Sequence, residues 1–200
     1  DTDGMLLDST EVYGSSEAIY IDYPLAYVAL NGGFQNDRRI AVVDLTTKAV
    51  DTLVVGDKPN SFAVVSGTLY VLCEGYQDWS GGGSTPASLW SLTSTTATEI
   101  LAAPTVNDHA IALRTDGNAL YFLNATYNGA VVSLSPNAAT AWPTNTLSAG
   151  VGYNLDIIND TMYVHNAKDF ASAGVIYACD LQGTVLDSIA AGVIPRQIIQ

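Results

Sequence analysis

The chain has 200 residues, of which 48% are hydrophobic and 14% charged, and its formal net charge at pH 7 is -13. Such an apolar content is enough for a sizeable core and excludes a disordered chain. The excess of carboxylates repels phosphate backbones and anionic lipid surfaces, so we expect no nucleic acid partner. No apolar stretch reaches the ~18 residues of a membrane span. The start has neither a basic segment nor an apolar signal core, so we expect a mature or excised polypeptide that does not span a membrane.

A phrase of two apolar runs joined by a turn recurs along the chain. It occupies residues 14–30, 54–72, 105–123 and 150–165, and in part 192–200. A third apolar run follows each complete phrase, at 40–45, 88–92, 130–135 and 174–181. A fourth run closes each unit, at 50–56, 99–104, 144–150 and 185–192. Four short strands that recur every ~42 to 49 residues are typical of a β-propeller blade.

The composition of the runs supports strands. They are rich in Val, Ile, Tyr and Leu and are bounded by Gly, Asn, Asp and Pro, and none shows helical spacing. We expect almost no helix, with turns at 66–67, 116–118 and 159–160 joining first to second strands. A β-sandwich is the alternative, but it does not explain the fixed order of the runs. Cys73 and Cys179 lie in different repeats, and we expect two buried thiols.

Several motifs carry a family resemblance. They are GDKPNSFAV at 56–64, LYV at 69–71, YVHN at 163–166 and IAVVDL at 40–45. In these motifs the chain resembles the YVTN-repeat, or surface-layer and YncE-like, β-propeller family. The run SLWSL at 88–92 departs from the pattern because it lacks the aspartate. The resemblance implies an all-β propeller of four-stranded blades, in a family whose ring usually has about seven blades.

The unit count sets the expected organisation. We expect complete blades at 15–56, 57–104, 105–150 and 151–192, with 193–200 as the first strand of a further blade. The segment MLLDSTEVY at 5–13 matches a fourth strand. An open propeller would expose strand edges. We therefore expect a fragment of a larger ring or a piece that another chain closes; a compact ring of four or five blades is the alternative.

Two sets of loops in a propeller open on one face, around the central channel. The first set leads into the innermost strands, and aligning the units places one polar residue of each at the channel mouth: Glu17, Asn60, His109, Asn154 and Arg196. These side chains either cap backbone groups and hydrate the channel or contact a ligand. Varied donors and acceptors that converge on a concave surface are typical of a binding pocket.

The second set joins second to third strands, at 31–39, 74–87, 124–129 and 165–170. Each loop contributes a polar residue at a strand end and at least one ring: Asn31, Phe34, Glu74, Tyr76, Trp79, Asn124, Tyr127, Asn166 and Phe170. Exposed aromatic residues beside Asn and Gly indicate a recognition surface. The alternative for any single ring is that it packs on a neighbouring blade.

Few residues are suited to catalysis or to metal binding. Asp37, Asp78 and Asp169 lie in three of these loops, but no DxDxDG motif is present. His109 and His165 are the two histidines, and the sequence has no GxSxG or HExxH motif. We expect no metal site, no cofactor and no catalytic residue, which favours a protein that is not an enzyme.

A further pattern concerns location. Asp followed by Ser or Thr occurs at 8–10, 51–53, 160–162 and 187–189, and resembles the O-glycosylation sequon of exported Bacteroidetes proteins. We expect a periplasmic or cell-surface protein. The family resemblance implies a non-catalytic binding module for a small molecule, a glycan or a partner protein, in the manner of lipoproteins that serve outer-membrane nutrient transporters. The alternatives are an assembly subunit of a surface complex and a propeller lactonase or lyase.

Overall fold

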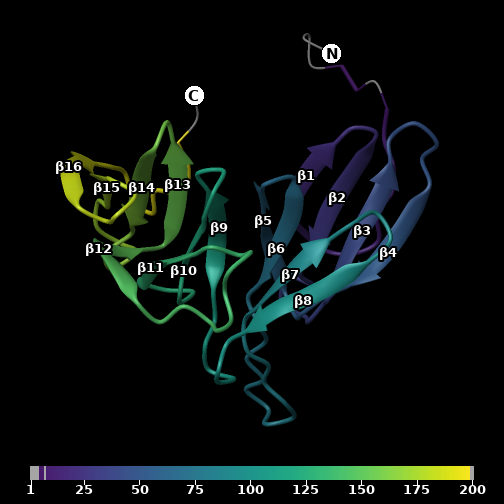
Figure 1. Cartoon of the computed structure of the whole chain (residues 1–200), viewed down its shortest axis with the longest axis horizontal. Coiled ribbons are helices and arrows are strands. Elements are labelled where there is room, and N and C mark those ends of the chain that lie inside the picture. The colour runs from purple at the N-terminus through teal and green to yellow at the C-terminus, as the bar shows by residue number, and fades with distance from the viewer. Residues whose placement is uncertain (1–4, 7, 199–200) are drawn as a thin grey trace.

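The computed structural model of the chain describes residues 5–6 and 8–198, which contain strands and no helix. The strands form four sheets of four, each an antiparallel meander in sequence order (Figure 1). The first two sheets consist of β1 (Ser16–Asp22), β2 (Leu25–Leu30), β3 (Arg39–Asp44) and β4 (Val50–Val54), then β5 (Pro59–Val65), β6 (Thr68–Cys73), β7 (Ser88–Leu92) and β8 (Ala97–Ala102). The last two consist of β9 (Ile111–Thr115), β10 (Leu120–Leu123), β11 (Gly129–Leu134) and β12 (Thr146–Gly152), then β13 (Asn154–Ile158), β14 (Thr161–Asn166), β15 (Val175–Cys179) and β16 (Val185–Ala190).

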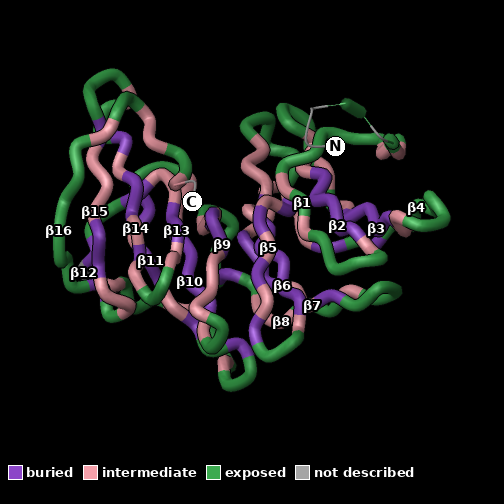
Figure 2. The backbone as a smooth tube through the Cα atoms, turned by 90° about the horizontal axis from the view of Figure 1, so that it is seen from above, coloured by how far each residue is buried: buried purple, intermediate pink, exposed green. Residues whose placement is uncertain are grey.

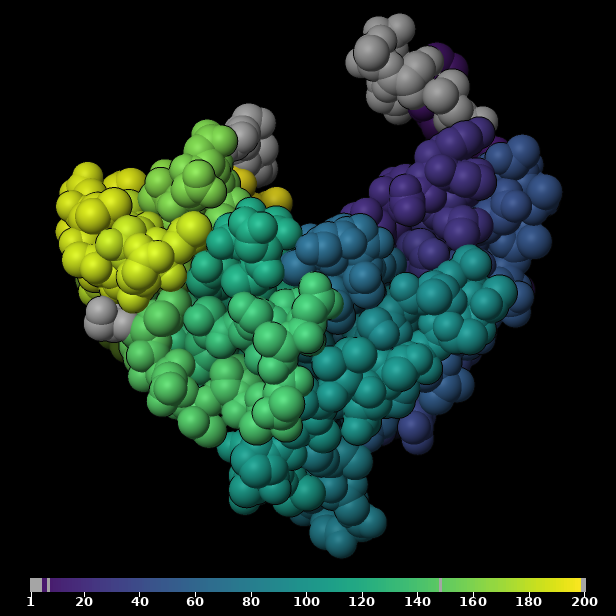
Figure 3. Space-filling model, in the orientation of Figure 1, coloured from purple at the N-terminus to yellow at the C-terminus, as the bar shows by residue number. Residues whose placement is uncertain are grey.

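The four sheets are arranged as propeller blades. Consecutive innermost strands contact one another, β1 with β5, β5 with β9 and β9 with β13. The all-β fold with four-stranded blades is therefore confirmed. The blades form an open arc, because the first and last blades stand apart across a notch (Figure 3). The compact closed ring is not the arrangement that this chain adopts.

The turns between first and second strands have the chemistry that tight hairpins need. Val65 pairs with Thr68, so that Ser66 and Gly67 form a two-residue loop, and both have positive φ angles. In the last blade the loop of Asn159 and Asp160 also has positive φ at both positions. Two consecutive positive φ angles define the turn type whose twist matches that of the flanking strands. The predicted turns at 66–67 and 159–160 are confirmed.

The core lies between blades rather than inside any one of them. Alternate residues of a strand point to opposite faces of its sheet, so each central blade packs on both neighbours. Between the second and third blades, Leu72, Leu89 and Phe122 are completely buried. Figure 2 shows burial on the middle strands of the blades, such as β2, β3, β6 and β10, whereas β1, β4 and β16 are mostly exposed. The thiols of Cys73 and Cys179 are free and buried, as expected.

The free face of the first blade is also apolar, and the N-terminal segment covers it in part. Ala26, Val28 and Val43 form a buried cluster there, and Val12 packs against them. The predicted strand at 5–13 is absent from its described residues, and Leu7 lies outside them.

The segment after β16 lies across the free face of the last blade. Its described residues belong to no strand. The side-chain amide of Asn154 donates to the carbonyl oxygen of Arg196, and the backbone N–H of Ile198 donates to Oδ2 of Asp156 at 3.0 Å. Side chains of β13 thus hold the backbone of residues 196–198.

The same kind of contact joins two innermost strands elsewhere in the arc. Asn60 in β5 donates its amide to the carbonyl oxygen of Ala110 at 3.0 Å, and the N–H of Leu113 donates to Oγ of Ser61 at 2.8 Å. Residues 196–198 therefore contact β13 much as the start of β9 contacts β5. That 193–200 begins a further blade stays a prediction, and residues 199–200 lie outside the described part.

No helix in the described part of the chain is long and apolar enough to cross a membrane.

Candidate ligand-binding site

The innermost strands and the loops beside them enclose one large cavity, of about 650 Å³. We call it the central cavity. It receives residues from all four blades and from the C-terminal segment. The predicted site residues that line it are Glu17, Asn31, Asn60, Glu74, Tyr127, Asn154 and Arg196.

Two carboxylates come from the first two blades. Glu17, in β1, is exposed, and its Oε2 accepts a hydrogen bond from the side-chain amide of Asn31 at 2.8 Å. Glu74 follows β6 and is half-buried, and its Oε1 accepts from the hydroxyl of Thr126 at 3.1 Å. Both partners are neutral, so neither carboxylate gains a counter-charge from them.

The surroundings of Glu74 disfavour its charged form. Burial raises the pKa of this carboxyl above its ordinary value, and the negative charge of Glu17 adds to the rise. The hydrogen bond from Thr126 and the positive charge of Lys58 act in the opposite direction but do not reverse it. Glu17 and Glu74 line the same cavity.

Tyr127 and Tyr153, from the last two blades, form another part of the wall, and the predicted residue Phe170 packs behind them without lining the cavity. Phe170 packs edge-on against Tyr127, with ring centroids 5.9 Å apart, and against Tyr153, at 5.2 Å. Edge-to-face pairs of this kind hold rings in a fixed orientation. The ring of Tyr127 remains 66% exposed, so much of its surface is free to meet a ligand.

The two arginines that line the cavity already have partners. Nε of Arg114 lies 3.2 Å from Oδ1 of Asp156. The guanidinium carbon of Arg196 lies 5.7 Å from the centroid of the Tyr153 ring, in a cation–π contact. The positive charges of the wall are therefore engaged, whereas the negative charges of Glu17 and Glu74 are not.

His109 lies outside the cavity lining. Its Nδ1 is 3.0 Å from the carbonyl oxygen of Glu74, and its Nε2 is 3.5 Å from Oε1 of Gln77. The ring thus fastens the entry of β9 to the β6–β7 loop. His165, the other histidine, is completely buried, with Nε2 3.2 Å from Oδ2 of Asp156.

Three further predicted residues have local structural contacts. Oδ1 of Asn124 accepts from the N–H of Ala130 at 2.9 Å, and Oδ1 of Asn166 accepts from the N–H of Lys168 at 2.7 Å. Tyr76 pairs with Thr85 across the base of the β6–β7 loop. These contacts shape the second-to-third-strand loops, and none of the three predicted residues lines the cavity.

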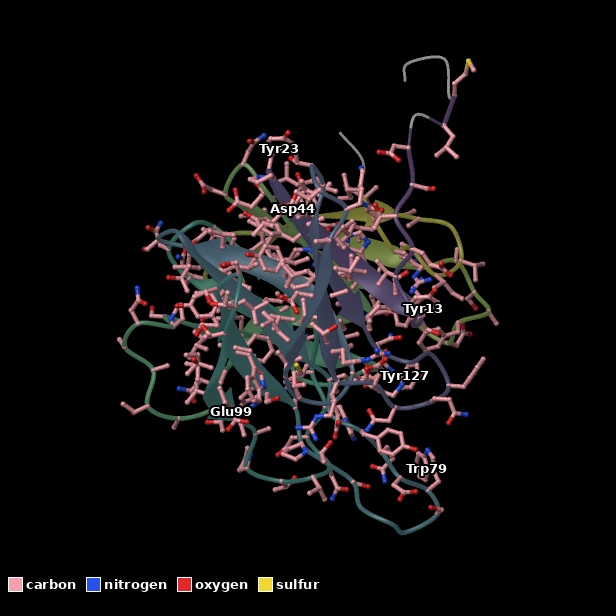
Figure 4. The ribbon with its side chains drawn as sticks, turned by 90° about the vertical axis from the view of Figure 1, so that its right-hand side faces the viewer. Tyr13, Tyr23, Asp44, Trp79, Glu99 and Tyr127 are labelled. Carbon is pink, nitrogen blue, oxygen red and sulfur yellow. The ribbon has the colours of Figure 1, made fainter. Side chains whose placement is uncertain are left out.

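Two predicted rings point into solvent. Phe34 is fully exposed, and Trp79, near the tip of the β6–β7 loop, is 91% exposed. Figure 4 shows Trp79 and Tyr127 toward one end of the molecule and Tyr23 and Asp44 toward the other. Trp79 and Tyr127 thus lie toward the same end of the molecule, but of the two only Tyr127 lines the central cavity.

Sequence reasoning missed part of the cavity wall. Tyr20, Phe62, Arg114, Thr126 and Tyr153 also line it. Phe62 stands two residues after Asn60 in β5, and alternation along a strand favours the same face for both. Tyr20 stands three residues after Glu17 in β1, where the strand register is irregular between Ser16 and Ala18. Tyr153 directly precedes the predicted site residue Asn154, and this aromatic side chain is the feature of the sequence that could have indicated its role in the wall.

The described residues include no group of three or more His, Cys, Asp or Glu side chains that could hold a metal ion.

Comparisons with known proteins identify the fold and no closer relationship. No family model matches the sequence, and no curated protein matches it significantly. Among solved structures, a quinonprotein alcohol dehydrogenase-like protein from Bacteroides thetaiotaomicron aligns with 90% of this chain and 47% of its own, with a TM-score of 0.62 and 13% identity. The β-propeller domain of Cps50 (Swd1) from Myceliophteria thermophila aligns with 92% of this chain and 60% of its own, with a TM-score of 0.57 and 11% identity.

One similar structure has the same extent as this chain. The computationally designed Ika4 protein aligns with 94% of this chain and 99% of its own, with a TM-score of 0.55 and 13% identity. The chain otherwise spans about half the length of the natural proteins that it matches. At these identities the likeness establishes a β-propeller fold, and the narrower YVTN-type resemblance stays a prediction.

Proposed function

We propose that this protein is a non-catalytic binding module that holds a small molecule, a glycan or a segment of a partner protein in the central cavity. The observation that carries the proposal is the composition of one cavity wall. Carboxylates, amides and aromatic rings from four separate blades meet there around about 650 Å³. A few polar groups among apolar and aromatic surfaces are the usual composition of a small-molecule site.

The positions of the two histidines support binding rather than hydrolysis. His109 bonds to the β6–β7 loop, and His165 is buried on the free face of the last blade. Neither lines the central cavity. A general base must lie within hydrogen-bond reach of its substrate, so a lactonase or lyase acting in this cavity would need another base.

The exposed rings support a second role on the same face. Phe34 and Trp79 offer apolar surface outside the cavity, and aromatic residues are enriched where proteins contact one another. Assembly into a surface complex is therefore the second candidate function. The finer proposal is a YVTN-type propeller exported to the periplasm or cell surface as an accessory of an outer-membrane transporter. Fractionation of the source cells tests that location.

Two matched substitutions test the proposed site. Tyr127 and Phe34 are exposed rings in equivalent loops, but Tyr127 lines the cavity and Phe34 does not. A thermal-shift library of metabolites and glycans is screened against the wild-type chain, Tyr127→Ala and Phe34→Ala. We expect compounds that stabilise the wild type to lose about tenfold in affinity with Tyr127→Ala and to bind Phe34→Ala as they bind the wild type.

Two outcomes count against the proposal. If Phe34→Ala weakens the binding of the compounds and Tyr127→Ala does not, the binding surface lies on the outer loops. The assembly role then gains support. If no compound stabilises the wild type, binding of a small molecule or glycan in this cavity is wrong.

A further inference from the structure

The central cavity has an unequal distribution of charge. The carboxylates of Glu17 and Glu74 line it from the first two blades, whereas the positive charge of Arg114 comes from the third blade and that of Arg196 from the C-terminal segment. Arg114 is paired with Asp156, and Arg196 lies over a tyrosine ring. Neither carboxylate belongs to an ion pair in the described part of the chain, because its bonded partners are Asn31 and Thr126.

Lys58 is one source of positive charge near Glu74. It is close enough to Glu74 to act on its pKa, but its ammonium group donates to the carbonyl oxygen of Gly33 at 2.7 Å. The lysine is thus held toward the β2–β3 loop rather than over the carboxylate. Two carboxylates that line one cavity without a paired cation attract positive charge from outside, and the net charge of -13 adds to that attraction.

The rings beside the carboxylates suit an organic cation. Thr126, whose hydroxyl binds Glu74, and the next residue Tyr127 both line the cavity. Phe170 packs edge-on against Tyr127 and fixes its orientation. The face of an aromatic ring attracts a cation, and a contact of this kind already exists between Arg196 and Tyr153 in the same cavity.

We propose that the central cavity binds an organic cation, an amine or alkylammonium group attached to an apolar body. The charged group lies against Glu17 and Glu74, and the apolar body lies against the ring of Tyr127. A metal ion fits the site less well, because the described residues place no three metal-ligating side chains together. This inference rests on the proposed function, since it names the ligand class of the same cavity.

Three compounds with one ring system and different charges test the inference. Tryptamine is a cation at pH 7.5, tryptophol is neutral and indole-3-acetate is an anion. Dissociation constants are measured by ligand-observed NMR for the wild-type chain. We expect tryptamine to bind about tenfold more tightly than tryptophol, and indole-3-acetate to bind most weakly.

Matched variants then locate the charge effect. Glu74→Gln, and separately the exposed Glu17→Gln, should weaken tryptamine binding about tenfold and leave tryptophol unchanged. The control is Glu99→Gln, which removes the same charge from an exposed position on the outer strand β8, and it should leave both constants unchanged (Figure 4). Tyr127→Leu should weaken tryptamine and tryptophol together. Melting temperatures of all variants exclude loss of folding as the cause.

The outcomes separate this inference from the function on which it rests. Equal affinities for the three compounds, or tighter binding of indole-3-acetate, would overturn the choice of a cation while leaving a binding module intact. Equal losses with Glu99→Gln and Glu74→Gln would mean that net charge, and not the cavity, attracts the amine. Absence of binding by all three compounds would also overturn the inference, and the separate library screen would then decide the proposed function.

Discussion

Asp156 shows how one residue of an innermost strand ties distant parts of the chain together. Its carboxylate contacts Arg114 in the preceding blade, His165 in its own blade and the backbone N–H of Ile198 in the C-terminal segment. Burial by itself would raise the pKa of Asp156. The contacts with His165, Ile198 and Arg114 outweigh burial and hold that pKa below its ordinary value.

We predict that Asp156→Asn lowers the free energy of unfolding at pH 7 by about 2–3 kcal/mol, because three contacts lose their charged acceptor. A pKa that is lower in the folded state contributes stability above the unfolded-state pKa and loses it as the pH falls through the folded value. The difference in the free energy of unfolding between the wild type and Asp156→Asn should therefore decrease below about pH 4.

Urea titrations at pH 7 and at lower pH measure this effect. The control is Asp187→Asn, since Asp187 is exposed in β16 and, within the described part of the chain, its side chain accepts a hydrogen bond from the adjacent N–H of Ser188 alone. The assigned contacts would be contradicted if both variants lost the same free energy of unfolding relative to the wild type, or if the loss for Asp156→Asn increased in acid.

At the scale of elements, the repeat predicts the strands and turns more completely than it predicts which side chains form the site. The hairpin turn at Ser66 and Gly67 follows from two small residues between apolar runs, and the observed positive φ angles agree with it. The strand-like segment at 5–13 forms no strand in its described residues. A local sequence pattern predicts that a segment can form a strand, but it does not show whether a neighbouring strand is present to pair with it.

The site was predictable in part, for a related reason. Asn60 and Asn154 lie at strand positions whose direction the repeat sets, and both line the cavity. His109 precedes β9 by two residues, and its ring bonds to a loop of another blade. Tyr127 and Phe34 occupy equivalent loops, but only the former has a ring neighbour in the next blade. Contacts between blades determine which of these residues line the cavity, and such contacts cannot be recognised within the sequence of a single repeat.

Gly67, the second residue of the hairpin turn between β5 and β6, allows a direct test of the turn type. Gly67 has a φ of +77° and open space where a Cβ would stand, so Gly67→Ala introduces backbone strain without a clash. We expect a loss of about 1 kcal/mol in the free energy of unfolding. Gly192 also has open space but no such φ, so Gly192→Ala should change stability little. Equal urea midpoints for the two variants would show that the turn is not the strained type described.

At the scale of the whole molecule, the open arc places one concave surface at the meeting point of four blades. The buried side chains between blades hold the innermost strands side by side, and the cavity exists because those strands converge without closing a ring (Figure 3). Carboxylates from the first half and rings from the second half face the same space. A ligand that contacts both halves would couple blades that share no direct contact.

Backbone NMR of the labelled protein, titrated with the compound that binds it best in the screen, tests this account most directly. The account predicts that shifts concentrate in the innermost strands and adjoining loops, around Glu17, Asn60, Glu74, Tyr127 and Asn154. Shifts confined to the outer strands β4, β8, β12 and β16, or to the tip of the loop that bears Trp79, would contradict it.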